Sequence, residues 1–168
     1  AAVFDPSSNP QLSRIYRLIA DSSVSFHDLS WMKLDDDSDL PRLNMAFELG
    51  LAVAIASMPE SDHQWFVFDT HPHRLHTALS DIGGYRPRVH DFSPESVLRG
   101  LMNALARRKH QPTLENLLAI HRKVVKAAAR IKSKYSNDLF DTRPFNDLSW
   151  VANQAAHKLI PSLAKRGE

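Results

Sequence analysis

Hydrophobic and polar residues follow two different periods in the first half of the chain. Residues 11–21 carry apolar side chains three and four positions apart, which predicts an amphipathic helix. Residues 24–29 alternate between apolar and polar side chains, as a short strand does. Residues 44–57 are apolar on almost every side, which is typical of a buried helix. The apolar run 65–69 ends in Asp69 and predicts a parallel strand that is buried on both faces.

The same alternation of helices and strands continues further along the chain. We expect a short helix over 72–82, which a pair of glycines ends, and a third strand over 88–90. Ser93 and Pro94 are typical of the N-cap and the first position of a helix, and this helix is expected to run to about residue 108. The order of elements predicts an α/β domain with a parallel sheet and right-handed crossovers.

The two ends of the chain differ from this pattern. Residues 5–10 are turn-forming, so we expect either that an initial strand and helix are missing from this chain or that residues 1–4 are the remnant of a strand. Beyond residue 112 the pattern is helical only, with Thr113 capping a long helix and Asn146 or Asp147 capping a final one. We therefore divide the chain into an α/β domain, residues 1–110, and an appended helical hairpin, residues 111–168.

Composition narrows the class of protein but not its activity. Hydrophobic residues make up 43% of the chain and charged residues 24%, which is ordinary for a soluble globular protein. No apolar run approaches the ~18–20 residues of a membrane helix, so we expect no contact with a membrane. The chain has no cysteine, which excludes disulfides and thiolate chemistry and fits a cytoplasmic protein.

Charge is distributed unevenly, although the formal net charge is only +2. Four aspartates lie within residues 35–39, whereas residues 107–134 carry nine positive charges and one negative charge, Glu115. This basic segment either follows a nucleic-acid backbone or forms the solvated face of an amphipathic helix. It lacks the interleaved aromatic residues of single-strand binders, so we expect the solvated face and no nucleic-acid partner.

Carboxylates occur where a doubly wound sheet binds its ligands. Asp28 closes the first predicted strand, Asp69 closes the second, and Glu48 lies on the helix between them. A carboxylate at this rim can attack an anomeric carbon or stabilise the oxocarbenium character of a breaking glycosidic bond, and a second one can orient hydroxyls or donate a proton. Alternatively, Glu48 caps the helix or pairs with Arg42 or Arg74 without any chemistry.

Several motifs identify a resemblance that covers nearly the whole chain. They are Phe26-His27-Asp28-Leu29-Ser30, Leu40-Pro41-Arg42-x-Asn44-Met45-x-Phe47-Glu48-Leu49-Gly50-Leu51, an apolar strand ending in Asp69, Ser80-Asp81-Ile82-x-Gly84, and Phe145-Asn146-Asp147. Together they resemble a bacterial family of unassigned function, whose members usually begin with an extra strand and helix. That family looks like a branch of the nucleoside 2-deoxyribosyltransferase and TIR-like group.

This resemblance implies a flavodoxin-like (Rossmann-like) fold and a nucleotide-binding site. In the larger group, a glutamate in a Glu-Leu-Gly type of motif attacks or stabilises C1′ of a nucleoside or of NAD, and the matching position here is Glu48. Asp28 is the second predicted catalytic residue. The predicted substrate-binding residues are Asn44, Asp69, Arg74, Asp81, His27 and Trp31.

Some of these residues have two interpretations. Arg74 is suited to bind a phosphate or carboxylate through both guanidinium nitrogens. Asp81 either binds a ribose hydroxyl or caps a turn, and His27 is either a core histidine or a ligand contact at the end of the strand. The histidines within 71–76 match no strong metal-binding signature, so we expect no metal and no resident cofactor.

The leading functional hypothesis is binding, with cleavage or transfer of the N-glycosidic bond, of a nucleoside or nucleotide, NAD included. The alternative is a non-catalytic module that senses a nucleotide, with the helical hairpin mediating homo-oligomerisation or partner binding. Nucleic-acid binding through the basic helix is a weaker alternative. Turnover separates the first hypothesis from the second, and a steep dependence of affinity on salt would support the third.

Overall fold

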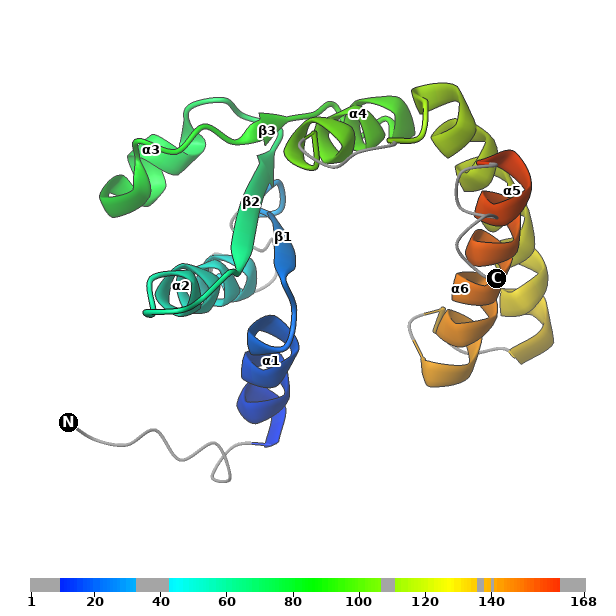
Figure 1. Cartoon of the computed structure of the whole chain (residues 1–168), viewed down its shortest axis with the longest axis horizontal. Coiled ribbons are helices and arrows are strands. Elements are labelled where there is room, and N and C mark those ends of the chain that lie inside the picture. The colour runs from blue at the N-terminus through cyan, green and yellow to red at the C-terminus, as the bar shows by residue number, and fades with distance from the viewer. Residues whose placement is uncertain (1–9, 33–42, 107–110, 136–137, 140, 161–168) are drawn as a thin grey trace, which may run out of the picture. The chain divides into compact units, whose positions relative to one another are not determined.

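The computed structural model describes residues 10–32, 43–106, 111–135, 138–139 and 141–160 (Figure 1). The chain divides into two compact units, residues 1–91 and residues 92–168. The sequence predicted a boundary at residue 110, so the structural division lies earlier and places the helix after the third strand in the second unit. The acidic cluster within 35–39 and Arg42 lie outside the described residues.

Unit 1 is a mixed α/β unit with a three-stranded parallel sheet in the order β1-β2-β3. Its elements are α1 (Pro10–Ala20), β1 (Val24–Asp28), α2 (Asn44–Ala56), β2 (Gln64–Asp69), α3 (Arg74–Ala78), the 3₁₀ turn η2 (Ser80–Ile82) and β3 (Arg88–Val89). The sequence therefore correctly predicts an α/β class and a parallel sheet. The helix expected over 72–82 is instead a short α-helix followed by the 3₁₀ turn.

One face of the sheet carries the core of unit 1. Val67 of β2 and Leu29, which directly follows β1, pack with Leu49 of α2 and Leu75 of α3. A second buried cluster joins α1 to the other side of α2 through Ile19, Ala52 and Ile55. Helix α2 is apolar almost all round because it packs against both the sheet and α1. Burying an aliphatic side chain contributes roughly 1.5–3 kcal/mol, so these contacts hold the unit together.

The opposite face of the sheet is aromatic and more exposed. Phe26 stacks on Phe66 with ring centroids 5.7 Å apart and meets Phe68 edge-on at 6.0 Å. Phe26 remains exposed and Phe66 half-buried. The prediction that the whole of 65–69 is buried is therefore wrong at its start, because only Val67, Phe68 and Asp69 are buried. The buried half of β2 is the half that ends at the carboxyl edge of the sheet.

Unit 2 is helical, as predicted for the end of the chain. It contains α4 (Pro94–Ala104), α5 (Leu114–Tyr135) and α6 (Thr142–Leu159), with α5 packed against both of the others. The hydroxyl of Ser93 accepts a hydrogen bond from Ser96 N at 3.2 Å, and that of Thr113 accepts one from Asn116 N at 3.2 Å, so both predicted caps are confirmed. No helix of the described ranges is long and apolar enough to span a membrane.

The start of the last helix differs from the prediction. Helix α6 begins at Thr142, about one turn before the predicted caps Asn146 and Asp147. Pro144 lies inside the first turn, where a missing backbone N–H costs no helical hydrogen bond. Pro144 is buried, so packing favours the longer helix.

Candidate functional site

The candidate site lies at the carboxyl edge of the sheet in unit 1. Asp28 ends β1, Asp69 ends β2, and His90 follows β3 directly. The strands are parallel, and the backbone pairing continues past their ends, with Leu29 N bonded to Phe68 O at 2.8 Å and His90 N to Asp69 O at 3.0 Å. The edge therefore gathers two carboxylates and a histidine, as expected for parallel α/β sheets.

Asp28, Ser30 and His90 form one connected network at this edge. Asp28 Oδ1 accepts hydrogen bonds from Ser30 N at 2.9 Å and from Ser30 Oγ at 2.5 Å. His90 Nε2 lies 3.0 Å from Ser30 Oγ and 3.4 Å from the same Asp28 oxygen. Ser30 and His90 are buried, while the side chain of Asp28 keeps 47% of its surface exposed. The network holds one oxygen of Asp28 and leaves its carboxylate open to solvent.

This Ser–His–Asp combination does not have the geometry of a hydrolase triad. In a triad the aspartate binds one imidazole nitrogen and the serine binds the other, so that the histidine can accept the serine proton. Here Asp28 and Ser30 approach the same nitrogen of His90, and Ser30 already donates its proton to Asp28. Ser30 is also fully buried, so its hydroxyl does not reach a substrate.

Asp69 and Arg74 form a second network beside the first. Asp69 is completely buried, and its Oδ1 accepts a hydrogen bond from His71 N at 3.0 Å and lies 3.5 Å from Arg74 Nη2. Its Oδ2 has no hydrogen-bond partner among the described residues. Leaving a buried carboxylate without a counterion costs several kcal/mol. Arg74 supplies the counterion of Asp69 and so offsets this cost.

Arg74 also reaches across to the loop that follows β1. Its Nη1 donates to Leu29 O at 2.9 Å and to Ser30 O at 3.2 Å, and its Nη2 donates to His71 Nδ1. The guanidinium thus ties the ends of β1 and β2 together. Both terminal nitrogens, which were predicted to bind a phosphate or carboxylate, are engaged with the protein.

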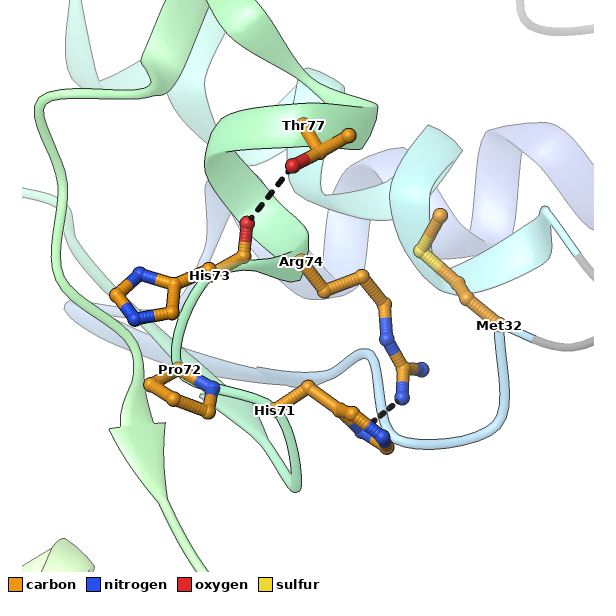
Figure 2. A pocket seen from close by; sticks show the side chains of 6 residues that line it. All are labelled: Met32, His71, Pro72, His73, Arg74 and Thr77. Carbon is orange, nitrogen blue, oxygen red and sulfur yellow. Dashed lines mark hydrogen bonds between the residues drawn. The ribbon is translucent and has the colours of Figure 1, made fainter.

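An open pocket of about 570 Å³ adjoins this network (Figure 2). It is lined by Met32, His71, Pro72, His73, Arg74 and Thr77. The lining combines apolar surface with histidine and arginine nitrogens and contains no carboxylate. Figure 2 shows Arg74 extending from α3 towards the ring of His71, with Met32 on the far side of the guanidinium. The volume is in the range of small-molecule sites.

Glu48 lies on α2, one turn after Asn44, as predicted from the spacing. The side chain is half-buried, and burial raises the pKa of the carboxyl above its usual range. Among the described residues it has no hydrogen-bond or salt-bridge partner, since Arg74 is engaged elsewhere and Arg42 is not described. Neither Glu48 nor Asn44 lines the pocket.

The remaining predicted residues are placed separately. His27 is 3% exposed and faces away from Asp28, on the core side of β1, where its Nε2 lies 2.8 Å from Ser25 Oγ. The structure thus gives His27 the place of a core histidine. Trp31 is exposed just after Ser30, and Asp81 is exposed in η2. Of the eight predicted site residues, only Arg74 lines the pocket.

Sequence reasoning missed three residues of the edge: Ser30, His71 and His90. Ser30 follows Asp28 by two positions, which is the spacing of an Asx turn. His90 comes immediately after the third strand, as Asp28 and Asp69 close theirs. Both signals were present in the sequence. His71 belongs to a histidine cluster without a metal-binding signature, and no group of three acidic or histidine residues that could hold a metal occurs among the described residues.

Comparison with known proteins gives no family for this chain. No protein-family model, no curated protein and no solved structure matches it.

Proposed function

We propose that this protein binds a nucleotide in the pocket of unit 1, with the phosphate facing the histidines of residues 71–73. The observation that carries the proposal is the composition of the pocket, which offers nitrogen donors and apolar surface and no carboxylate. An anionic phosphate favours such a lining, because no carboxylate of the pocket repels it. The position at the carboxyl edge of a parallel sheet, where α/β domains bind ligands, supports the same conclusion.

The flavodoxin-like assignment belongs to this proposal as well. That fold has the strand order 2-1-3-4-5, in which three consecutive strands lie side by side only in the run 3-4-5. The order β1-β2-β3 is compatible with that run. If the chain lacked only strand 1 of that order, β1 and β2 would correspond to strands 2 and 3, which lie on either side of strand 1. β1 and β2 are instead hydrogen-bonded neighbours, which does not fit that alignment. Homo-oligomerisation and a cytoplasmic location are further parts of the proposal.

A calorimetric titration tests nucleotide binding. AMP should bind the wild-type protein, and adenosine, which lacks the phosphate, should bind at least about tenfold more weakly, since hydrogen bonds to a charged group are the stronger ones. His73→Ala removes one donor from the pocket and should weaken AMP binding. His157→Ala, an exposed histidine of α6, is the matched control and should change nothing. Equal affinities for AMP and adenosine would refute the phosphate site.

Chemistry at C1′ through Glu48 is the second candidate function. It is favoured by one observation, the half-buried carboxylate of Glu48, whose pKa is raised and which has no partner in the described part of the chain. Such a group is typical of functional sites, because a purely structural carboxylate would be paired. Asp28, with one oxygen held in place, would orient ribose hydroxyls.

Turnover decides between binding alone and catalysis. The protein is incubated with NAD and with a panel of deoxynucleosides, and release of the free base or of nicotinamide is followed for the wild type and for Glu48→Gln. Catalysis through Glu48 requires product from the wild type and none from the variant. If both proteins are inert while AMP still binds, the nucleotide-sensing alternative holds.

A further inference from the structure

The hydrogen bonds of Arg74 determine which nitrogen of His71 carries a proton. An arginine guanidinium is a donor only, because it stays protonated and has no acceptor atom. Its Nη2 bonds to Nδ1 of His71, so Nδ1 must be the acceptor and must lack a proton. Thr70 Oγ1 lies 2.9 Å from the same nitrogen and can donate to it as well. The single proton of the His71 imidazole is therefore on Nε2.

Within the described part of the chain, no competing interaction favours the other tautomer. Asp69 Oδ1 lies 3.9 Å from His71 Nδ1, which is too far for a hydrogen bond, whereas Arg74 Nη2 is closer to that oxygen, at 3.5 Å. The same aspartate oxygen is already bonded to the backbone N–H of His71. The carboxylate therefore holds Arg74 and the backbone in place, and Arg74 in turn holds the ring.

The second nitrogen of His71 is available to a ligand. The side chain of His71 is 63% exposed and lines the pocket, and its Nε2 has no partner among the described residues. In Figure 2 one edge of the ring meets Arg74 and the rest of the ring is free of the other labelled side chains. Arg74, in contrast, has both terminal nitrogens occupied by protein acceptors.

We propose that His71 is a ligand-binding donor of the pocket and that Arg74 is its positioning residue. Arg74 fixes His71 as the Nε2–H tautomer, and the Nε2–H group donates a hydrogen bond to a phosphate oxygen of the bound nucleotide. This inference rests on the proposed function for the ligand and on the unliganded geometry for the tautomer. It assigns to His71 the contact that the sequence had assigned to Arg74.

The tautomer is tested without any ligand by ¹⁵N NMR of the histidine side chains in the full chain. His71 of the wild type should show an unprotonated Nδ1, a protonated Nε2 and a coupling through the hydrogen bond to Arg74 Nη2. Arg74→Lys keeps the charge but cannot serve every acceptor at once, so the coupling should vanish and the Nδ1–H form should appear. A protonated Nδ1 in the wild type, or unchanged signals in the variant, would overturn the role of Arg74.

The ligand contact is tested with AMP and a matched pair of substitutions. The side-chain amide of glutamine places its N–H near the position of histidine Nε2, and that of asparagine places it near Nδ1. His71→Gln should therefore keep AMP affinity within about threefold of the wild type, while His71→Asn should lose about tenfold or more. Both variants are first checked for folding by circular dichroism. Equal affinities in the two variants would overturn the Nε2 contact.

The two kinds of failure are distinguishable. If AMP does not bind the wild type, the proposed function fails and the ligand contact of His71 fails with it, while the NMR measurement still decides whether Arg74 fixes the tautomer. If AMP binds and the paired variants behave alike, nucleotide binding stands and the role of His71 is wrong.

Discussion

Two of the histidine networks described in unit 1 hold a histidine ring in a similar way, but only one of them leaves the ring accessible. In the interior network, Ser25 Oγ lies 2.8 Å from His27 Nε2 and 2.9 Å from His63 Nε2, and His63 Nδ1 donates to Ser22 O at 2.6 Å. In the edge network, which consists of Asp69, His71 and Arg74, the ring of His71 accepts a hydrogen bond from Arg74. Both networks fix a tautomer through a group of known polarity, the carbonyl in the first and the guanidinium in the second.

The two networks differ in the surroundings of the ring nitrogen that makes no hydrogen bond within the network. With one proton on each ring, the interior chain runs from His27 Nε2–H to Ser25 and from Ser25 to His63, which leaves His27 Nδ1 buried and without a partner in the described structure. His71, in contrast, has an exposed side chain that lines the pocket, and its Nε2 has no partner among the described residues. A fixed tautomer is thus structural when the remaining nitrogen is buried and able to bind when it is open.

Removing the buried carboxylate should have the largest effect on this comparison. Asp69→Ala leaves Arg74 without its counterion and removes the acceptor of His71 N, so the free energy of unfolding should fall by about 3 kcal/mol. Asp81→Ala, at an exposed aspartate of η2, is the control and should stay within about 0.5 kcal/mol. Urea denaturation measures both. A small effect at Asp69 would mean that the edge network does not depend on its carboxylate.

Acid should destabilise the interior network. Burial, and secondarily the nearby His63, lower the pKa of His27 to about 4, from 6.5 in an exposed histidine. The unfolded chain therefore binds more protons between pH 6.5 and 4, and the free energy of unfolding falls as pH falls through this window, by roughly 3 kcal/mol at pH 4. His27→Gln should remove this part of the pH dependence. Parallel stability curves for the two proteins would contradict the assignment.

Two glycine substitutions test how tightly the segment after α3 is packed. A Cβ on Gly83 would lie 2.9 Å from Ser80 O and 3.2 Å from the ring of His76, so Gly83→Ala should destabilise the protein by about 1–3 kcal/mol. A Cβ on Gly50, within α2, meets nothing within 4 Å, so Gly50→Ala should stabilise it by about 0.5–1 kcal/mol. Thermal unfolding gives both signs. If both substitutions stabilised the protein, or both destabilised it, the effect of an added methyl group would not depend on the space around it.

The smallest effect is expected at Glu48. Burial raises the pKa of Glu48, because the folded state disfavours the charged carboxylate. The free energy of unfolding therefore falls as pH rises and the carboxyl loses its proton in the folded state. Glu48→Gln should therefore be slightly more stable than the wild type at pH 7, and this advantage should shrink towards pH 4. A loss of stability at pH 7 would show that Glu48 has a structural partner.

The sequence predicted the framework better than the site, for a physical reason. Strand ends and helix faces follow from hydrophobic periodicity, so the positions of Asp28, Asp69 and Glu48 relative to the strands were predictable. Side-chain pairing across elements does not follow from periodicity. The contact of Arg74 with Leu29 O joins residues 45 positions apart, and no local pattern indicates it.

The same limit explains why the sequence did not predict the different accessibility of His27 and His71. Both follow or precede an aspartate near a strand end, and their local sequences give no sign of which is accessible. Strand alternation points the side chains of His27 and Asp28 to opposite faces of the sheet, and the structure buries His27 while Asp28 remains exposed. The importance of His71 depends on where Arg74 points, which only the fold determines.

The most direct test of nucleotide binding at the edge is a titration of the ¹⁵N-labelled wild-type protein with AMP, followed by amide and histidine NMR signals. Saturable shifts should centre on residues 71–77 and Met32, include the Nε2–H of His71, and be absent with adenosine at the same concentrations. No saturable shift, or shifts confined to the helices of unit 2, would contradict a phosphate site at the carboxyl edge of the sheet.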